Sequence, residues 1–146
     1  MKRTRISEET LVKHAVERLQ QTDGVSVGTE VPLAGRLVDL VYVQAEEVFT
    51  IEFKLADWRR ALRQARDHLL GADKAFVCMP PRKVSQDMRD EFERAGIGLL
   101  FFRDDWDWPF ELVIEAPPSQ ETWVVARRQV YEVVADEPGR RPTVYV

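Results

Sequence analysis

Three strand-like runs, joined by short connections and enclosed between two helical patterns, constrain the fold of this chain more than any other feature. The runs cover residues 25–31, 37–43 and 48–55, and apolar residues recur in each of them. Residues 32–35 join the first run to the second, and residues 44–47 join the second to the third. Parallel neighbours need a long crossover, so connections this short predict an antiparallel meander.

The segments on either side of this block have helical periodicity. Before it, Ser7 is a suitable N-cap for a helix that extends to about Gln21 and carries one apolar stripe. After it, the pattern predicts helix, strand, helix and strand in that order, at residues 56–70, 75–79, 85–95 and 97–102. Strands that alternate with helices imply parallel pairing with right-handed crossovers. We therefore predict an α/β fold with a mixed central sheet flanked by helices.

The last part of the chain has a less regular pattern. It predicts a strand over residues 106–114, a helix over 121–135 and a short strand over 142–146. The helix would use Trp123, Ala126, Val130 and Val134 as its inward side. Because 146 residues fit one domain, we predict a single domain over residues 1–146. Its core would span about 7–102, with a C-terminal elaboration at about 103–146.

The composition excludes several classes of protein. A hydrophobic content of 45% with 32% charged residues predicts a packed core under a charged surface. No apolar run approaches the ~20 residues of a membrane-spanning helix, and the basic N-terminus leads into no apolar signal region. The one cysteine, Cys78, excludes an internal disulfide. We expect a cytoplasmic protein without a membrane partner. The net charge of -4 argues against coating of nucleic acid by bulk charge but is compatible with a local basic surface.

Charged residues lie inside the second and third strand-like runs. Alternation along a strand places Thr50, Glu52 and Lys54 on one face of the third run. Asp39 lies in the middle of the second run, where an acid is costly unless it is paired or binds a metal. One explanation is a solvated face of an edge strand. The other is that Asp39 and Glu52 converge on a divalent cation with Lys54 beside it, since Mg²⁺ needs few protein oxygens and keeps several waters.

The helix that follows these runs favours the second explanation. On a helical wheel Arg60, Gln64 and His68 fall on one flank, while Arg59, Arg63 and Arg66 fall on the opposite flank. A polar flank beside the strand that carries Glu52 would be placed to contact a phosphate or a water at the cation.

These residues resemble the PD-(D/E)XK nuclease superfamily, which includes restriction endonucleases, Holliday-junction resolvases and RecB-type nucleases. The resemblance covers roughly the first two-thirds of the chain, and the predicted α-β-β-β-α-β order is that of the superfamily's restriction endonuclease-like core. It is carried by Thr29-Glu30-Val31, Arg36-Leu37-Val38-Asp39-Leu40-Val41, Ile51-Glu52-Phe53-Lys54 and Gln64. The proline that usually precedes the aspartate is Val38 here.

The resemblance implies an endonuclease that hydrolyses DNA phosphodiester bonds with Mg²⁺ or Mn²⁺. Asp39 and Glu52 would be the metal ligands, together with the Phe53 carbonyl. Lys54 would be the catalytic lysine, and Gln64 would support the attacking water or the phosphate.

The resemblance also suggests a further acidic ligand. Resolvase-like members carry a glutamate on the first helix that completes the metal site, and Glu17 is similar to it. Glu30 is a second candidate, because it lies on the strand beside the site. Some RecB-type members have a glutamine and a tyrosine four residues apart on the following helix. Here only Gln64 matches, since position 68 is His68.

Two other interpretations stay open at this point. The chain could be a catalytically inactive nuclease-fold module that binds nucleic acid or a protein partner in the same groove. Alternatively, an unrelated α/β fold could carry an accidental match, in which case Asp39 and Glu52 would lie on opposite faces of the sheet. A homodimer is common in the superfamily, but no residue here demonstrates one.

Overall fold

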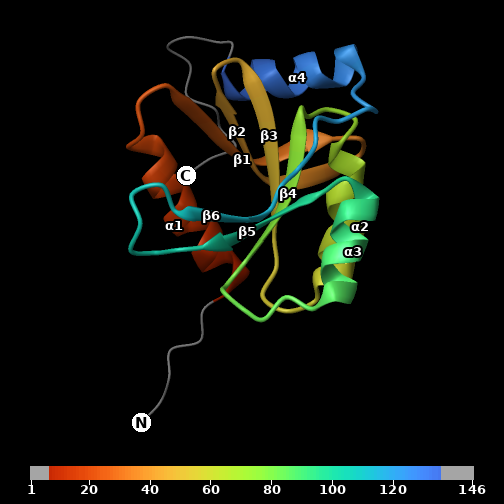
Figure 1. The fold of residues 1–146 in the computed structure, drawn as a ribbon. Coiled ribbons are helices and arrows are strands. Elements are labelled where there is room, and N and C mark those ends of the chain that lie inside the picture. Colours follow the sequence, from red (N-terminus) through yellow and green to blue (C-terminus); the bar gives the residue numbers. More distant parts are fainter. Residues whose placement is uncertain (1–6, 136–146) are drawn as a thin grey trace.

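The protein is built on one six-stranded sheet with the strand order β1-β2-β3-β4-β5-β6, in a computed structural model that describes residues 7–135 (Figure 1). The strands are β1 Val25–Leu33, β2 Arg36–Gln44, β3 Glu47–Phe53, β4 Lys74–Met79, β5 Gly98–Phe102 and β6 Phe110–Ile114. The first three strands pair antiparallel, and β3, β4 and β5 pair parallel. The predicted meander that continues into a parallel half-sheet is therefore confirmed. An antiparallel β6 completes the sheet beyond β5.

Four helices cover this sheet: α1 Glu8–Gln20, α2 Trp58–His68, α3 Gln86–Ala95 and α4 Val124–Val134. Polar side chains begin three of them, because the first N–H groups of a helix have no partner within it. Ser7, Asp57 and Ser85 each accept a hydrogen bond from the backbone three residues later. Gly96 ends α3 at φ 73, a left-handed conformation that glycine adopts without strain.

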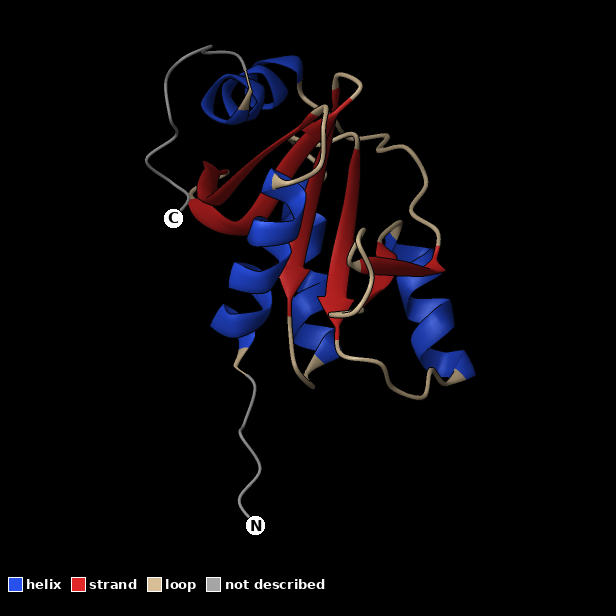
Figure 2. Ribbon diagram, turned by 90° about the vertical axis from the view of Figure 1, so that its left-hand side faces the viewer, coloured by secondary structure: helices blue, strands red, loops and turns tan. Residues whose placement is uncertain are grey.

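Helices lie on both faces of the sheet (Figure 2). The apolar stripe of α1 packs on one face, against Leu40, Ile51 and Phe53 among others. The opposite face has two clusters. In one, α2 and α3 cover β4 and β5, and in the other α4 covers the meander through Ala126, Val130 and Val134. Because side chains alternate along a strand, each strand of this sheet contributes to two separate cores.

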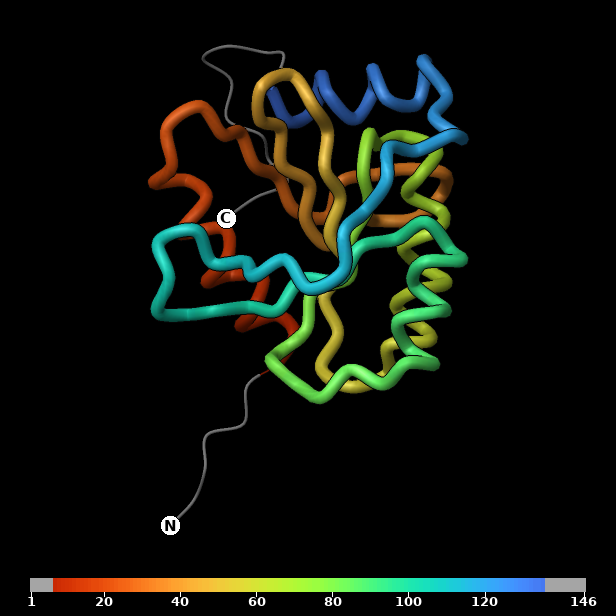
Figure 3. Tube along the Cα trace, viewed as in Figure 1, coloured from red at the N-terminus to blue at the C-terminus, as the bar shows by residue number. Residues whose placement is uncertain are grey.

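Several predicted boundaries were wrong. The first strand runs on through Pro32, which is tolerated because β1 is an edge strand and proline lacks only an N–H. The third strand ends at Phe53, so Lys54 lies just outside it. The predicted strand over residues 106–114 begins only at Phe110, and the residues before it form a loop. Figure 3 shows this loop beside α1, where Arg18 Nη1 donates a hydrogen bond to the Trp106 carbonyl at 2.7 Å.

The predictions for the end of the chain were partly correct. The last helix buries Ala126, Val130 and Val134 as expected. Trp123 is instead the residue that precedes the helix, and it is 56% exposed. The predicted strand at 142–146 lies outside the described residues. Within residues 7–135, no helix is both long enough and apolar enough to cross a membrane.

Candidate functional site

The candidate site lies where β2 and β3 stop pairing. Their last paired residues at this end are Leu40 and Ile51. One position further, in the same register, Asp39 comes opposite Glu52. Asp39 Oδ2 accepts a hydrogen bond from the Phe53 backbone N–H at 2.8 Å, which takes the place of a bond between the two strands. The two carboxyl groups therefore meet at the point where the strands diverge.

A two-residue turn sets this register. Gln44 pairs with Glu47, and the two residues between them, Ala45 and Glu46, have φ values of 51° and 65°. Two successive left-handed residues are typical of the tight turns that join antiparallel strands. The register that this turn fixes at one end of the hairpin brings Asp39 to Glu52 at the other end.

The two carboxyl groups form a partly buried pair of neighbouring acids, and each of them affects the ionisation of the other. Burial, and after it the charge of the neighbouring Asp39, raise the pKa of Glu52 to about 8. Burial also raises the pKa of Asp39. Without a cation, the pair therefore holds a proton at neutral pH.

Lys54 and Glu8 lie next to this pair. Lys54 directly follows β3, and its backbone N–H still donates to the Cys78 carbonyl of β4 at 3.0 Å. Its ammonium nitrogen is 3.9 Å from Glu8 Oε1. The other oxygen of Glu8 accepts a hydrogen bond from the Leu55 N–H at 3.1 Å. Glu8 thus holds the segment after β3 through one oxygen and faces the catalytic-lysine candidate with the other.

Sequence reasoning missed Glu8. An acidic residue in the first turn of a helix is expected in any case, because it complements the helix dipole. The position of Glu8 in the sequence therefore gave no sign of a second role. Its approach to Lys54 depends on how α1 crosses β3, which no local pattern encodes.

The two acidic residues proposed as further ligands lie in different places. Glu17 lines a separate hollow with His14, Arg18 and Asp104, so the structure does not bring it to the carboxyl pair. Glu30 lies in register opposite Asp39, between the pairs Thr29–Leu40 and Val31–Val38, and has a left-handed φ of 51°. Glu30 also lines a groove of about 500 Å³ that contains Asp39 and Glu8. Glu8 and Glu9 are thus the acids of α1 that line this groove, and Glu8 is the one that contacts Lys54 and Leu55.

Four buried polar atoms without hydrogen-bond partners among the described residues lie on β3 and on the helix α2 that packs against it. Within residues 7–135 the buried side-chain atoms that have no hydrogen bond are Thr50 Oγ1, Glu52 Oε1, Gln64 Oε1 and His68 Nδ1. Thr50 and Glu52 share one face of β3, and Gln64 and His68 share one flank of α2, which packs on β3. His68 is 2% exposed, with its Nε2 at 3.6 Å from Glu52 Oε1. Burial lowers the pKa of His68 to about 4, so the imidazole is neutral at pH 7.

The carboxyl pair fits a hard divalent cation. Two adjacent acids that cannot both ionise, and an orphaned oxygen on Glu52, are the features that a cation would relieve. In the described part of the chain, no three His, Cys, Asp or Glu side chains form a cluster that could hold a metal. A cation here would therefore use two carboxylates and complete its shell with main-chain oxygen or water, as Mg²⁺ commonly does. The Phe53 carbonyl stays a predicted ligand.

Comparison with known proteins identifies the fold. No family model and no curated protein matches the sequence. Among solved structures, SPO1766, a protein of unknown function from Silicibacter pomeroyi, is similar with a TM-score of 0.60 and 20% identity, over 87% of this chain and 83% of that one. An XisH family protein from Nostoc punctiforme is similar with a TM-score of 0.52 and 14% identity, over 73% of this chain and 98% of that one. The XisH family protein has a restriction endonuclease-like fold, so the fold predicted from the sequence is confirmed.

Proposed function

We propose that this protein is a metal-dependent nuclease that hydrolyses DNA phosphodiester bonds. The observation that carries the proposal is the meeting of Asp39 and Glu52 where β2 and β3 diverge, with Lys54 directly after them. Such a pair is expensive to bury without a cation, because burial and mutual repulsion both oppose its ionisation. The restriction endonuclease-like fold is compatible with this function.

Asp39 and Glu52 would hold Mg²⁺ or Mn²⁺ between them. When bound, the cation would activate a water molecule and neutralise negative charge on the phosphate. The hydrogen bond from the Phe53 N–H keeps Asp39 in a fixed orientation, so little has to move when the site is loaded. Binding also requires Glu52 to lose its proton, and this makes occupancy of the site dependent on pH.

Lys54 would stabilise the charge that develops on the phosphate. The Lys54 side chain is 19% exposed and therefore only partly screened by water, which strengthens its effect on a nearby anion. Glu8 keeps this group close to the pair. Gln64, on the α2 flank beside β3, would position the attacking water or the phosphate through its carboxamide.

A cleavage assay with matched variants tests the proposal. Duplex DNA, single-stranded DNA, branched DNA and RNA would each be incubated with Mg²⁺, with Mn²⁺ and with EDTA. We expect cleavage of DNA that requires the cation and is lost in both Asp39→Asn and Lys54→Ala. Cleavage that persists in both variants, or in EDTA, would assign the activity to something other than this site.

A second candidate is a non-catalytic module that binds nucleic acid or a protein with the same fold. Within residues 7–135 no three acidic, histidine or cysteine side chains form a cluster that could hold a metal, and this favours the module. Calorimetric titration with Mn²⁺ separates the two functions. Heat of binding that disappears in Asp39→Asn supports the nuclease, whereas the absence of binding to the wild type supports the module.

A further inference from the structure

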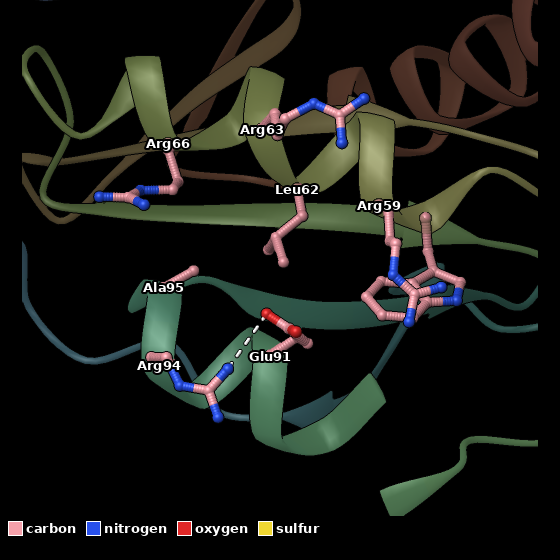
Figure 4. A pocket seen from close by; sticks show the side chains of 8 residues that line it. Arg59, Leu62, Arg63, Arg66, Glu91, Arg94 and Ala95 are labelled. Atoms are coloured by element: carbon pink, nitrogen blue, oxygen red, sulfur yellow. Dashed lines mark ion pairs between the residues drawn. The ribbon is translucent and has the colours of Figure 1, made fainter. Parts of the chain in front are cut away.

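A groove between α2 and α3 is lined by four arginines. Arg59, Arg63 and Arg66 come from α2 and Arg94 comes from α3, around a volume of about 210 Å³. Figure 4 shows Leu62 pointing from α2 between the helices, and the four guanidinium groups spread along the groove instead of gathering at one point. This arginine groove contains none of the residues of the carboxyl pair.

Half of this positive charge has no counterpart in the protein. Arg59 pairs with Asp87 at 2.7 Å, and Arg94 pairs with Glu91 at 3.2 Å. Arg63 and Arg66 form no hydrogen bond or ion pair with any described residue. They are exposed neighbours three residues apart on one helix, where like charges repel. The chain as a whole carries a charge of -4, so this local excess is opposite in sign to the rest of the molecule.

The arrangement fits an extended polyanion better than a single small anion. A small anion would need guanidinium groups that converge, whereas these are distributed along the helix. Seven residues separate Arg59 from Arg66, which corresponds to about 10 Å of helix axis. At about 3.4 Å per nucleotide of one strand, this length spans roughly three phosphates. The Arg59 guanidinium lies 4.2 Å from the centre of the Trp58 ring, which limits its motion.

We propose that the arginine groove binds the phosphate backbone of the nucleic acid, with Arg63 and Arg66 as its principal contacts. The inference rests on the proposed function for the identity of the ligand. Helix α2 begins at Trp58, four residues after Lys54, so the Arg59 end of the groove is the end nearer in the chain to the carboxyl pair. The groove would hold the part of the DNA that extends beyond the site.

Binding measured without a cation tests this proposal apart from catalysis. Fluorescence anisotropy would follow labelled duplex DNA in EDTA over a series of salt concentrations. The variants are Arg63→Gln, Arg66→Gln and the double variant, with Arg128→Gln, an exposed arginine on α4, as the control that matches the charge change of each single variant. We expect the double variant to bind about tenfold more weakly and the slope of log affinity against log salt to become shallower by about 2. The control should change the affinity less than twofold, roughly as expected for a charge outside the contact.

Three results would overturn the inference. The first is a double variant with the affinity and the salt slope of the wild type, and the second is a wild type that does not bind DNA. The third is a polyglutamate peptide whose binding requires Arg63 and Arg66 when the binding of DNA does not require them. The last would assign the groove to an acidic protein. A wild-type protein that binds DNA through the groove in EDTA but does not cleave it when Mg²⁺ or Mn²⁺ is added would refute only the nuclease. Thermal unfolding would confirm that each variant is folded.

Discussion

Asp39 replaces a backbone carbonyl in the sheet: its Oδ2 accepts the Phe53 N–H at 2.8 Å, directly beyond the last pair of β2 and β3. The same carboxyl group lies opposite Glu52 and affects its pKa. Asp39 therefore has a structural role and a proposed chemical role, and suitable substitutions should separate them.

Asp39→Asn should keep the structural role and lose the chemical one. An amide oxygen can still accept the Phe53 N–H, whereas alanine leaves this donor without a partner. We expect Asp39→Ala to lower the free energy of unfolding by about 1–2 kcal/mol more than Asp39→Asn does. Urea unfolding measures the difference, and Mn²⁺ titration should show that neither variant binds the cation. Equal destabilisation by the two substitutions would mean that the hydrogen bond contributes little.

The stability of the metal-free protein should fall as the pH rises from about 6.5 to about 8 and level off above that. The folded-state pKa of Glu52 is about 8, above its ordinary value of 4.5, so the folded protein holds this proton more tightly than the unfolded chain does. The resulting stabilisation is complete below about pH 4.5 and is lost progressively up to about pH 8, where the folded protein also loses the proton. His68 acts in the opposite direction but at lower pH, because its pKa of about 4 makes protonation costly only below about 6.5.

Unfolding curves recorded across this pH range, with and without Mg²⁺, would measure the effect. Glu52→Gln should abolish the decline, and the cation should oppose it in the wild type because it binds the ionised pair. A wild-type stability that is flat between pH 6.5 and pH 8 and unaffected by Glu52→Gln would show that the pKa of Glu52 is not raised in the folded protein.

Glu8→Gln should reduce cleavage while Glu17→Gln should not. Glutamine can still accept the Leu55 N–H but no longer attracts the Lys54 ammonium group. Groups that orient catalytic residues typically change activity by about 10- to 100-fold, and we expect a loss in this range. Both glutamates lie on α1, so Glu17→Gln is a control of equal chemistry on the same helix. An equal loss in both variants would assign the effect to α1 in general.

His68→Phe should leave the free energy of unfolding unchanged or slightly higher. His68 Nδ1 is buried without a hydrogen bond, and an aromatic ring of similar size removes this unsatisfied group. Chemical unfolding at pH 7 gives the result. A loss of more than about 2 kcal/mol would indicate that ordered water forms hydrogen bonds to His68, Gln64 and Thr50 in solution. Removal of the His68 imidazole would then leave the other polar groups of this network without a hydrogen-bond partner.

The fold could be predicted to a large extent from the sequence because its signals are local. The period-2 alternation of residues 48–53 separates Ile51 and Phe53 from Thr50 and Glu52, and these pairs do lie on opposite faces. The helix ends were also signalled locally, by Ser85 at the start of α3 and Gly96 at its end. Lys54 was misplaced in the strand, because nothing in the residues themselves shows where the pairing with β2 stops.

The sequence by itself determined which residues face which way along each strand and helix, since this follows from backbone periodicity alone. Only the tertiary structure decided which of those faces meet. The hairpin turn at Ala45 and Glu46 lacks the asparagine and glycine typical of its shape, so its length, and with it the register of Asp39 and Glu52, depends on the packing of both strands against α1 and α4. The choice of Glu8 over Glu17 likewise depends on where α1 crosses the sheet, a contact between segments far apart in the chain.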